Sequence, residues 1–273
     1  MNYHTHTLSN GLRIIHAQNQ SAVAYCGYAI DAGTRDEEEN EQGMAHFVEH
    51  LIFKGTQKRH SWHILNRMEH VGGDLNAYTN KEETVVYSAF MKEHFERAAE
   101  LIFDIVFHST YPQHEIEKEC EVIVDEINTY KDSPADMIFD TFEDSIFAGS
   151  ELGHNILGTK AALMRHTSES IKRFVARTHT TDQMVFSSIG NMSVKSVQSV
   201  VAKYLAEQPI STRDFKRLAP EKVEQLHKKA EGLPLLKYNI TMSCITIRMF
   251  QQKLKVYMLL LYETIIGRIA GGY

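Results

Sequence analysis

The sequence predicts an α+β fold, a two-layer domain in which helices pack on a β-sheet. Three observations favour this class. β-favouring runs and helical runs both recur along the 273 residues, without the strict strand–helix alternation of parallel α/β folds. Several helical runs carry apolar residues at spacings of three and four, which is typical of a helix with one buried face. Hydrophobic residues make up 43% of the chain, so a substantial core can form.

The expected strands are short runs of β-branched, aromatic and small residues that end at turn residues. They cover residues 10–18, 21–33, 74–80, 83–91 and 181–190, and the third and fourth form a hairpin. Helices are expected at residues 43–53, 61–73, 92–109, 114–132, 135–147, 166–179 and 194–206. Ser61 is expected to cap the second helix, and residues 34–42 read as a charged, solvated connector.

Charge and cysteine content exclude several classes of protein. The net charge is −6 with both signs mixed along the chain, whereas a nucleic-acid-binding protein would show a basic face. Cys26, Cys120 and Cys244 match neither a disulfide framework nor a zinc–thiolate spacing, so a reducing, cytoplasmic location is expected. The first residues lack the pattern of a secretory signal. The apolar run at residues 256–262 is far too short to cross a bilayer, so no membrane partner is expected.

The stretch HFVEHLIFKGT, residues 46–56, contains candidate metal-binding and catalytic residues. His46, Glu49 and His50 share one helical face because residues three and four apart are neighbours on a helix. Two imidazoles at this spacing suit one zinc ion, and a glutamate beside them can take a proton from an activated water. The order His-x-x-Glu-His is the inverzincin pattern. The alternative is a surface turn with solvated side chains, but the apolar flanking residues weaken it.

A catalytic zinc needs a third protein ligand and an open fourth position. The best segment for that ligand is the acidic helical run at residues 114–132. Its six acids are Glu115, Glu117, Glu119, Glu121, Asp125 and Glu126. Glu119 and Glu126 are two helical turns apart and share a face. Spacing alone does not choose among the six, and a solvated acidic surface is the alternative for each.

Several stretches together resemble the N-terminal zinc domain of the inverzincin metallopeptidases, the family of pitrilysin, insulysin and the mitochondrial processing peptidase. The similar stretches, in the family's order and spacing, are NGLRII, AGTRDE, GMAHFVEHLIFKGT, VGGDLNAYTNKEETVVYSAF, ECEVIVDEI, GHNILGT and DQMVFSSIGNMS. The resemblance spans residues 10–206 and implies a pitrilysin-like metallopeptidase fold.

The resemblance also implies a ligand set and a reaction. One zinc ion per chain would be held by His46, His50 and Glu126, since Glu126 falls at the family's spacing for the third ligand. Glu119 would orient a ligand from behind it. The implied reaction is hydrolysis of a peptide bond, with Glu49 as general base and then general acid.

The implied substrate is an extended or unfolded polypeptide. In the family, the strand that corresponds to NAYT pairs with substrate, which here assigns Asn76 and Ala77 to substrate binding. Pairing through the main chain would give affinity without strict sequence choice.

The chain is expected to divide at residue 212. Residues 1–212 would form the zinc metallopeptidase domain, and residues 213–273 a linker and the truncated start of a second, similar domain. The alternative function is a zinc-binding but inactive fragment or subunit, which needs a partner chain to supply the missing domain. The apolar stripe expected near residues 256–269 also favours self-association into a homo-oligomer.

Overall fold

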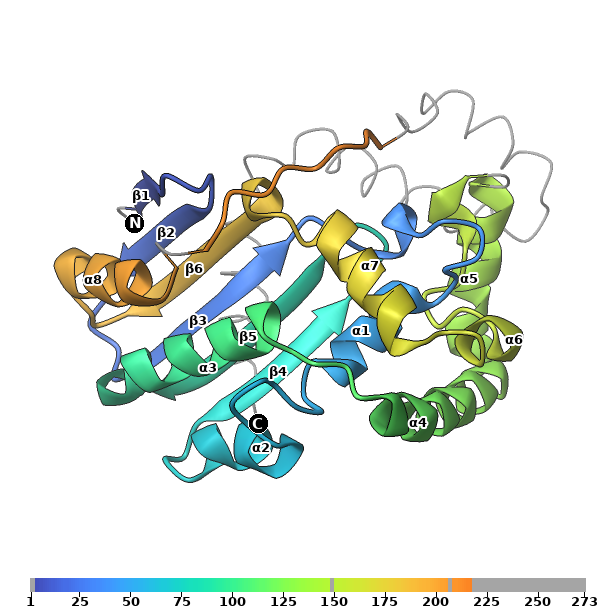
Figure 1. Ribbon diagram of the computed structural model, residues 1–273, viewed down its shortest axis with the longest axis horizontal. Coiled ribbons are helices and arrows are strands. Elements are labelled where there is room, and N and C mark those ends of the chain that lie inside the picture. The colour runs from blue at the N-terminus through green and yellow to red at the C-terminus, as the bar shows by residue number, and fades with distance from the viewer. Residues whose placement is uncertain (1–2, 148–149, 206–207, 218–273) are drawn as a thin grey trace.

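A six-stranded mixed sheet forms one layer of the domain and helices form the other (Figure 1). The computed structural model describes residues 3–147, 150–205 and 208–217. The strand order is β1-β2-β6-β3-β5-β4, and all neighbours are antiparallel except the parallel pair β2 and β6. The strands are β1 (Tyr3–Thr7), β2 (Arg13–Gln18), β3 (Val23–Ile30), β4 (Asp74–Thr79), β5 (Thr84–Met91) and β6 (Met184–Gly190).

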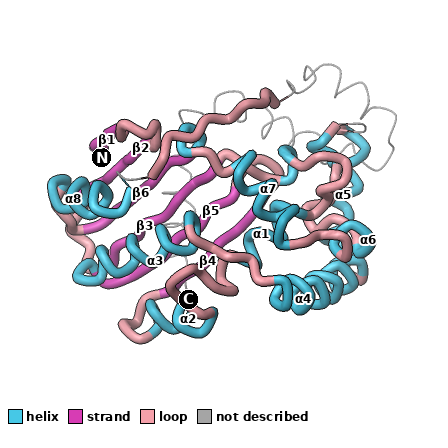
Figure 2. The backbone as a smooth tube through the Cα atoms, viewed as in Figure 1, coloured by secondary structure: helices cyan, strands magenta, loops and turns pink. Residues whose placement is uncertain are grey.

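Helices account for most of the remaining described chain (Figure 2). The α-helices are α1 (Met44–Leu51), α2 (Ser61–Glu69), α3 (Phe95–Phe107), α4 (Gln113–Lys131), α5 (Pro134–Ile146), α6 (Lys160–Leu163), α7 (Ser168–Thr178) and α8 (Val194–Leu205). Short 3-10 turns are η1 (Thr34–Asp36), η2 (Lys92–His94), η3 (Glu151–Gly153) and η4 (Thr181–Gln183). The predicted α+β class is confirmed. Within the described part of the chain, no helix has the length and apolar character that a bilayer span requires.

The core lies between the sheet and the helices. Along β6, buried and half-buried residues alternate, because successive side chains of a strand point to opposite faces. Tyr28 of β3 contacts Phe186 of β6 edge to face, with ring centroids 5.2 Å apart. The same ring contacts Phe107 of α3 at 5.7 Å. These contacts join the middle of the sheet to the helix that crosses it.

Three local features differ from the sequence predictions. Strand β1 was not predicted, because all of its side chains are exposed and leave no alternating apolar pattern. It is held by main-chain pairing with β2. The predicted cap at Ser61 is wrong, because α2 begins at Ser61 and the residue in the capping position is His60. The four-residue helix α6 was also not predicted.

The connector at residues 34–42 is solvated only in part, because residues 38–40 are exposed whereas Thr34, Asp36 and Glu41 are buried. Glu37 accepts hydrogen bonds from the backbone N–H groups of Gly43 and Ala45, each at 2.9 Å. These groups lie at the start of α1, where N–H groups have no partner within the helix. Gly43 has a φ of 81°, and a Cβ there would lie 2.7 Å from the carbonyl oxygen of Leu157. The connector therefore fixes where α1 begins.

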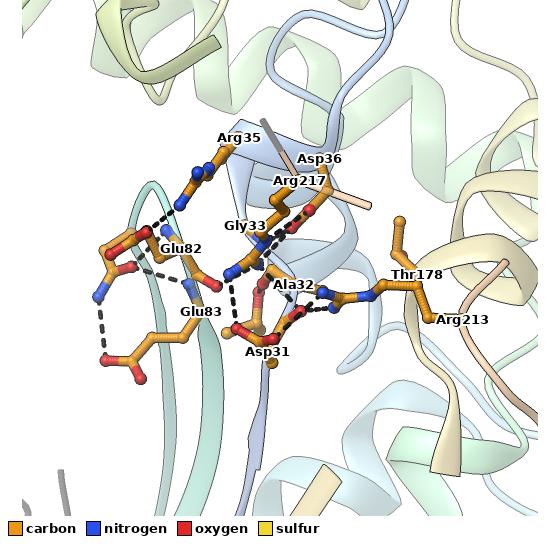
Figure 3. Close-up of polar contacts among 12 residues, drawn as sticks. Asp31, Ala32, Gly33, Arg35, Asp36, Glu82, Glu83, Thr178, Arg213 and Arg217 are labelled. Atoms are coloured by element: carbon orange, nitrogen blue, oxygen red, sulfur yellow. Dashed lines mark hydrogen bonds and ion pairs between the residues drawn. The ribbon is translucent and has the colours of Figure 1, made fainter. Parts of the chain in front are cut away.

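The described end of the chain, residues 208–217, is tied to the domain by two arginines (Figure 3). Arg217 binds both carboxylate oxygens of Asp36, at 2.8 and 2.6 Å, and one oxygen of Asp31 at 2.6 Å. It also donates to the carbonyl of Glu82 in the β4–β5 hairpin at 2.7 Å. Arg213 pairs with Asp31 at 3.1 Å. The first part of the expected linker thus packs on the domain, whereas residues 218–273, including Cys244, lie outside the described residues. The division at residue 212 stays a prediction.

We expect Arg217→Met to lower the free energy of unfolding by about 3 kcal/mol, because it leaves the buried Asp36 carboxylate without its cation. Lys216→Met is the matched control, since Lys216 is exposed, and its effect should stay within about 0.5 kcal/mol. Urea unfolding of the three proteins measures both values. Equal stabilities for the two variants would contradict this role of Arg217.

Candidate metal centre

Helix α1 separates an apolar face from a polar one. Its buried apolar residues include Met44, Phe47, Val48 and Leu51. His46, Glu49 and His50 lie on the remaining side, and the ring centroids of the two histidines are 4.7 Å apart. The structure therefore brings these three predicted residues together, as their spacing on a helix requires.

Helix α4 carries a carboxylate to the two imidazoles. The Oε2 atom of Glu126 lies 3.9 Å from Nε2 of His46 and 3.7 Å from Nε2 of His50. One ligand atom from each of these residues lies within 4.8 Å of the others. The Glu126 side chain is 45% exposed, so the cluster is open to solvent on that side.

The three residues suit a zinc ion. Their separations are too long for hydrogen bonds, and zinc accepts imidazole nitrogen and carboxylate oxygen at about 2.0–2.1 Å. Burial, followed by the nearby His50, lowers the pKa of His46 to about 4, so this imidazole is neutral at neutral pH. Across the described ranges, no second cluster of histidine, cysteine or acidic side chains has such an arrangement.

Glu119 contacts His50 on the side of its ring away from Glu126. Its Oε2 atom is 3.1 Å from Nδ1 of His50, and its Oε1 atom is 2.6 Å from Nζ of Lys54. Burial alone would raise the pKa of Glu119, but hydrogen bonds and charge from His50 and Lys54 outweigh it and lower the pKa. Glu119 is thus a buried, ionised acceptor for the nitrogen of His50 that faces away from Glu126.

The remaining acids of α4 face elsewhere. Glu117, Glu121 and Asp125 are exposed, and Glu115 pairs with Lys118 at 2.8 Å. Glu119 and Glu126 are the acids of α4 that lie near the histidines, and they are the two that the resemblance selects. The helical spacing alone left all six open.

Glu49 points toward the end of strand β4. Thr79, the last residue of that strand, is the polar neighbour whose side chain and backbone favour the charged form of Glu49. Burial is the largest influence on its carboxyl group and raises its pKa, while Thr79 and His50 oppose the change. A carboxylate whose pKa is raised holds a proton more readily than an ordinary glutamate, which suits a group that accepts and returns a proton.

Strand β4 forms one edge of the sheet and pairs with β5 on its other side. Asn76 lies opposite Tyr87, and Ala77 lies opposite Val86. The side-chain oxygen of Asn76 accepts a hydrogen bond from the backbone N–H of Ala77 at 2.8 Å. Both predicted substrate-binding residues therefore lie on an edge strand whose last residue, Thr79, contacts Glu49.

Sequence reasoning missed three residues around the centre. Lys54 lies four residues after His50, and its position on the continuing helical turn could have been read from the motif. Glu37 belongs to an acidic run just before α1, which is where a carboxylate can bind free N–H groups. Thr79 gave no signal, because its contact with Glu49 depends on how the hairpin meets the helix.

Comparisons with known proteins place the chain in a family. The sequence pattern of the family described as "Insulinase (Peptidase family M16)" matches residues 13–160. The chain is 33% identical over 206 residues to "Uncharacterized zinc protease YmxG" of Bacillus subtilis, covering 74% of this chain and 50% of that protein. It is also 33% identical over 216 residues to the mitochondrial-processing peptidase subunit beta of Dictyostelium discoideum, covering 78% and 46%. The chain spans about half the length of these relatives.

Solved structures confirm the expected pitrilysin-like fold. The periplasmic protease PqqL from Escherichia coli superposes with a TM-score of 0.75 at 23% identity, over 81% of this chain and 25% of that one. A peptidase M16 inactive domain from Pseudomonas fluorescens gives 0.74 at 16% identity, over 81% and 54%. Together with the sequence match over more than half of its length, the fold and the His-x-x-Glu-His helix show that this chain belongs to peptidase family M16.

Proposed function

We propose that this chain is the catalytic domain of a zinc-dependent endopeptidase, which hydrolyses peptide bonds in extended or unfolded polypeptides. The observation that carries the proposal is the meeting of His46, His50 and Glu126 at one point beside Glu49. Membership of a peptidase family supports proteolysis in general. Relatives named zinc proteases support the choice of metal.

In this proposal His46, His50 and Glu126 hold the zinc ion, with one position left for water or substrate. The bound ion supplies a Lewis acid for the scissile carbonyl and lowers the pKa of water. Glu49 accepts the proton of the attacking water at its carboxylate and returns it to the leaving amine. Glu119 accepts a hydrogen bond from the Nδ1–H group of His50, which leaves the Nε2 lone pair free to face the ion.

Substrate would bind as an additional strand on the free edge of β4, with Asn76 and Ala77 contributing. Main-chain hydrogen bonds would hold the peptide, so the selection would favour an extended chain over a particular sequence. Thr79, at the end of the same strand, contacts the proposed base, and a strand on this edge would run toward Glu49.

The second candidate is a zinc-binding subunit that is inactive alone and needs a partner chain. The specific observation that favours it is length, since the chain spans about half of its relatives. One similar structure is described as an inactive domain, and other relatives are named as subunits. Self-association is a further route to a complete assembly. A reducing, cytoplasmic location stays our prediction, and Cys26 and Cys120 are free thiols in the described residues.

Removing a ligand should remove the metal. We expect His46→Ala and Glu126→Ala to lose most of the one zinc per chain that the wild type retains after dialysis, because two ligands hold zinc far more weakly than three. Metal content is measured by atomic emission. Asp125→Ala is the matched control, since Asp125 is the exposed neighbour of Glu126, and it should keep full zinc. Full zinc in Glu126→Ala combined with loss in Glu119→Ala would reverse the assignment of the two acids.

Glu49→Gln should keep the zinc and lower peptide hydrolysis by about 10²–10⁴-fold, since an amide cannot accept the proton from water. The measurement pairs metal content with turnover of an unfolded, fluorogenic peptide. Glu69→Gln, at an exposed glutamate on α2, should change neither quantity. Loss of zinc from Glu49→Gln would show that Glu49 is a ligand and not the base.

The two candidate functions differ in what the chain does alone. We expect slow turnover of an unfolded peptide by these 273 residues alone, because the relatives are about twice as long and their additional length would supply further transition-state contacts and exclude water. Adding a chain that carries the second half of a longer relative should raise the rate. Light scattering measures the mass of the chain in the same buffer. Brisk, zinc-dependent turnover by a monomer would rule out the need for a partner.

A further inference from the structure

Lys54 lies at the end of a row of polar contacts that leads to the metal centre. It follows α1, where its backbone N–H bonds to the carbonyl of Leu51 at 3.0 Å. Its Nζ atom lies 2.6 Å from Oε1 of Glu119, and Oε2 of the same carboxylate lies 3.1 Å from Nδ1 of His50. The two oxygens of Glu119 thus have different partners. One faces a fixed positive charge and the other faces a metal-binding imidazole.

The surroundings of Glu119 make the lysine contact important. The Glu119 side chain is only 9% exposed, so water can replace little of what Lys54 provides. An exposed ion pair contributes little because water competes for both partners, whereas a buried carboxylate that loses its cation must move or be neutralised. Either change would remove the acceptor for the Nδ1 proton of His50. His50 would then be free to turn or to place its proton on Nε2, the atom that faces Glu126.

We propose that Lys54 is a positioning residue for the metal centre, which fixes the Glu119 carboxylate so that Glu119 holds His50 with Nε2 directed toward the zinc ion. This inference rests on the proposed zinc site. Lys54 touches neither the ion nor the substrate in this account. Its influence passes through two side chains, and such outer contacts to a metal-binding histidine typically change metal affinity 10–100-fold when removed.

The first test measures zinc affinity by competition with a chromogenic chelator. Lys54→Met should weaken zinc binding by about tenfold or more. Lys54→Arg should recover affinity to within about threefold, because arginine can also donate to Oε1. Lys58→Met is the matched control, since Lys58 is an exposed lysine on the same loop, and it should bind zinc as the wild type does. Circular dichroism verifies that all variants are folded, and Lys54→Gln replaces Lys54→Met if the latter is not.

A double-mutant cycle separates positioning from a general structural effect. If Lys54 acts through Glu119, then Lys54→Met should cost little further affinity in a Glu119→Gln background. Nitrogen NMR of the metal-free protein gives an independent reading, because the wild type should show the Nδ1–H form of His50 and Lys54→Met should show a mixture of the two forms.

Each outcome decides a separate point. Wild-type affinity in Lys54→Met, or additive losses in the cycle, would overturn the positioning role while the zinc site stands. A wild type that binds no zinc would overturn the proposed function itself, and with it this role. Non-additive losses with rescue by arginine would establish both.

Discussion

The contact between α1 and α4 is the constraint on which the centre depends. Helix α1 must bury its apolar face in the core, and this packing fixes the direction of His46, Glu49 and His50. Helix α4 must bury Ile116, Ile123 and Ile127, and this packing brings Glu119 and Glu126 to the histidines. Polar contacts add to this packing, since Glu37 binds the start of α1 and Glu119 joins α4 to His50 and Lys54. The cluster is thus assembled by contacts within the protein chain itself.

The sequence predicted those parts of the structure that have a local period. The three residues of α1 follow from helical spacing, and the strands other than β1 follow from composition and turn residues. Strand β1 was not predicted because it is held by backbone pairing and has no buried face. The choice of Glu126 and Glu119 among six acids depends on how α1 and α4 pack against each other. Residue spacing along one helix gives no information about that packing. The family resemblance supplied the choice, because members of a family share the arrangement of their helices.

The same distinction explains why charged residues were misjudged. Residues 34–42 were read as solvated because of their charge, yet Glu37 binds the start of α1 and Glu41 pairs with Arg177. Composition shows how polar a segment is. It does not show whether the folded protein places backbone N–H groups or arginine side chains close enough to bind the acidic residues of that segment. Arg213 and Arg217, at the start of the predicted linker, also have acidic partners that composition does not reveal, namely Asp31 and Asp36.

The hydrogen bond from the backbone N–H of Ala77 to the side chain of Asn76 affects how readily other chains pair with the edge of β4. An exposed sheet edge is a template on which any extended chain can aggregate. On β4, the carboxamide of Asn76 already occupies one main-chain donor of that edge. A strand that binds here must first break the hydrogen bond between Ala77 and the Asn76 carboxamide, which costs on the order of 1 kcal/mol. A chain that offers several more hydrogen bonds recovers this cost, whereas a brief, partial encounter does not. The edge therefore discriminates by the length of the strand that approaches it.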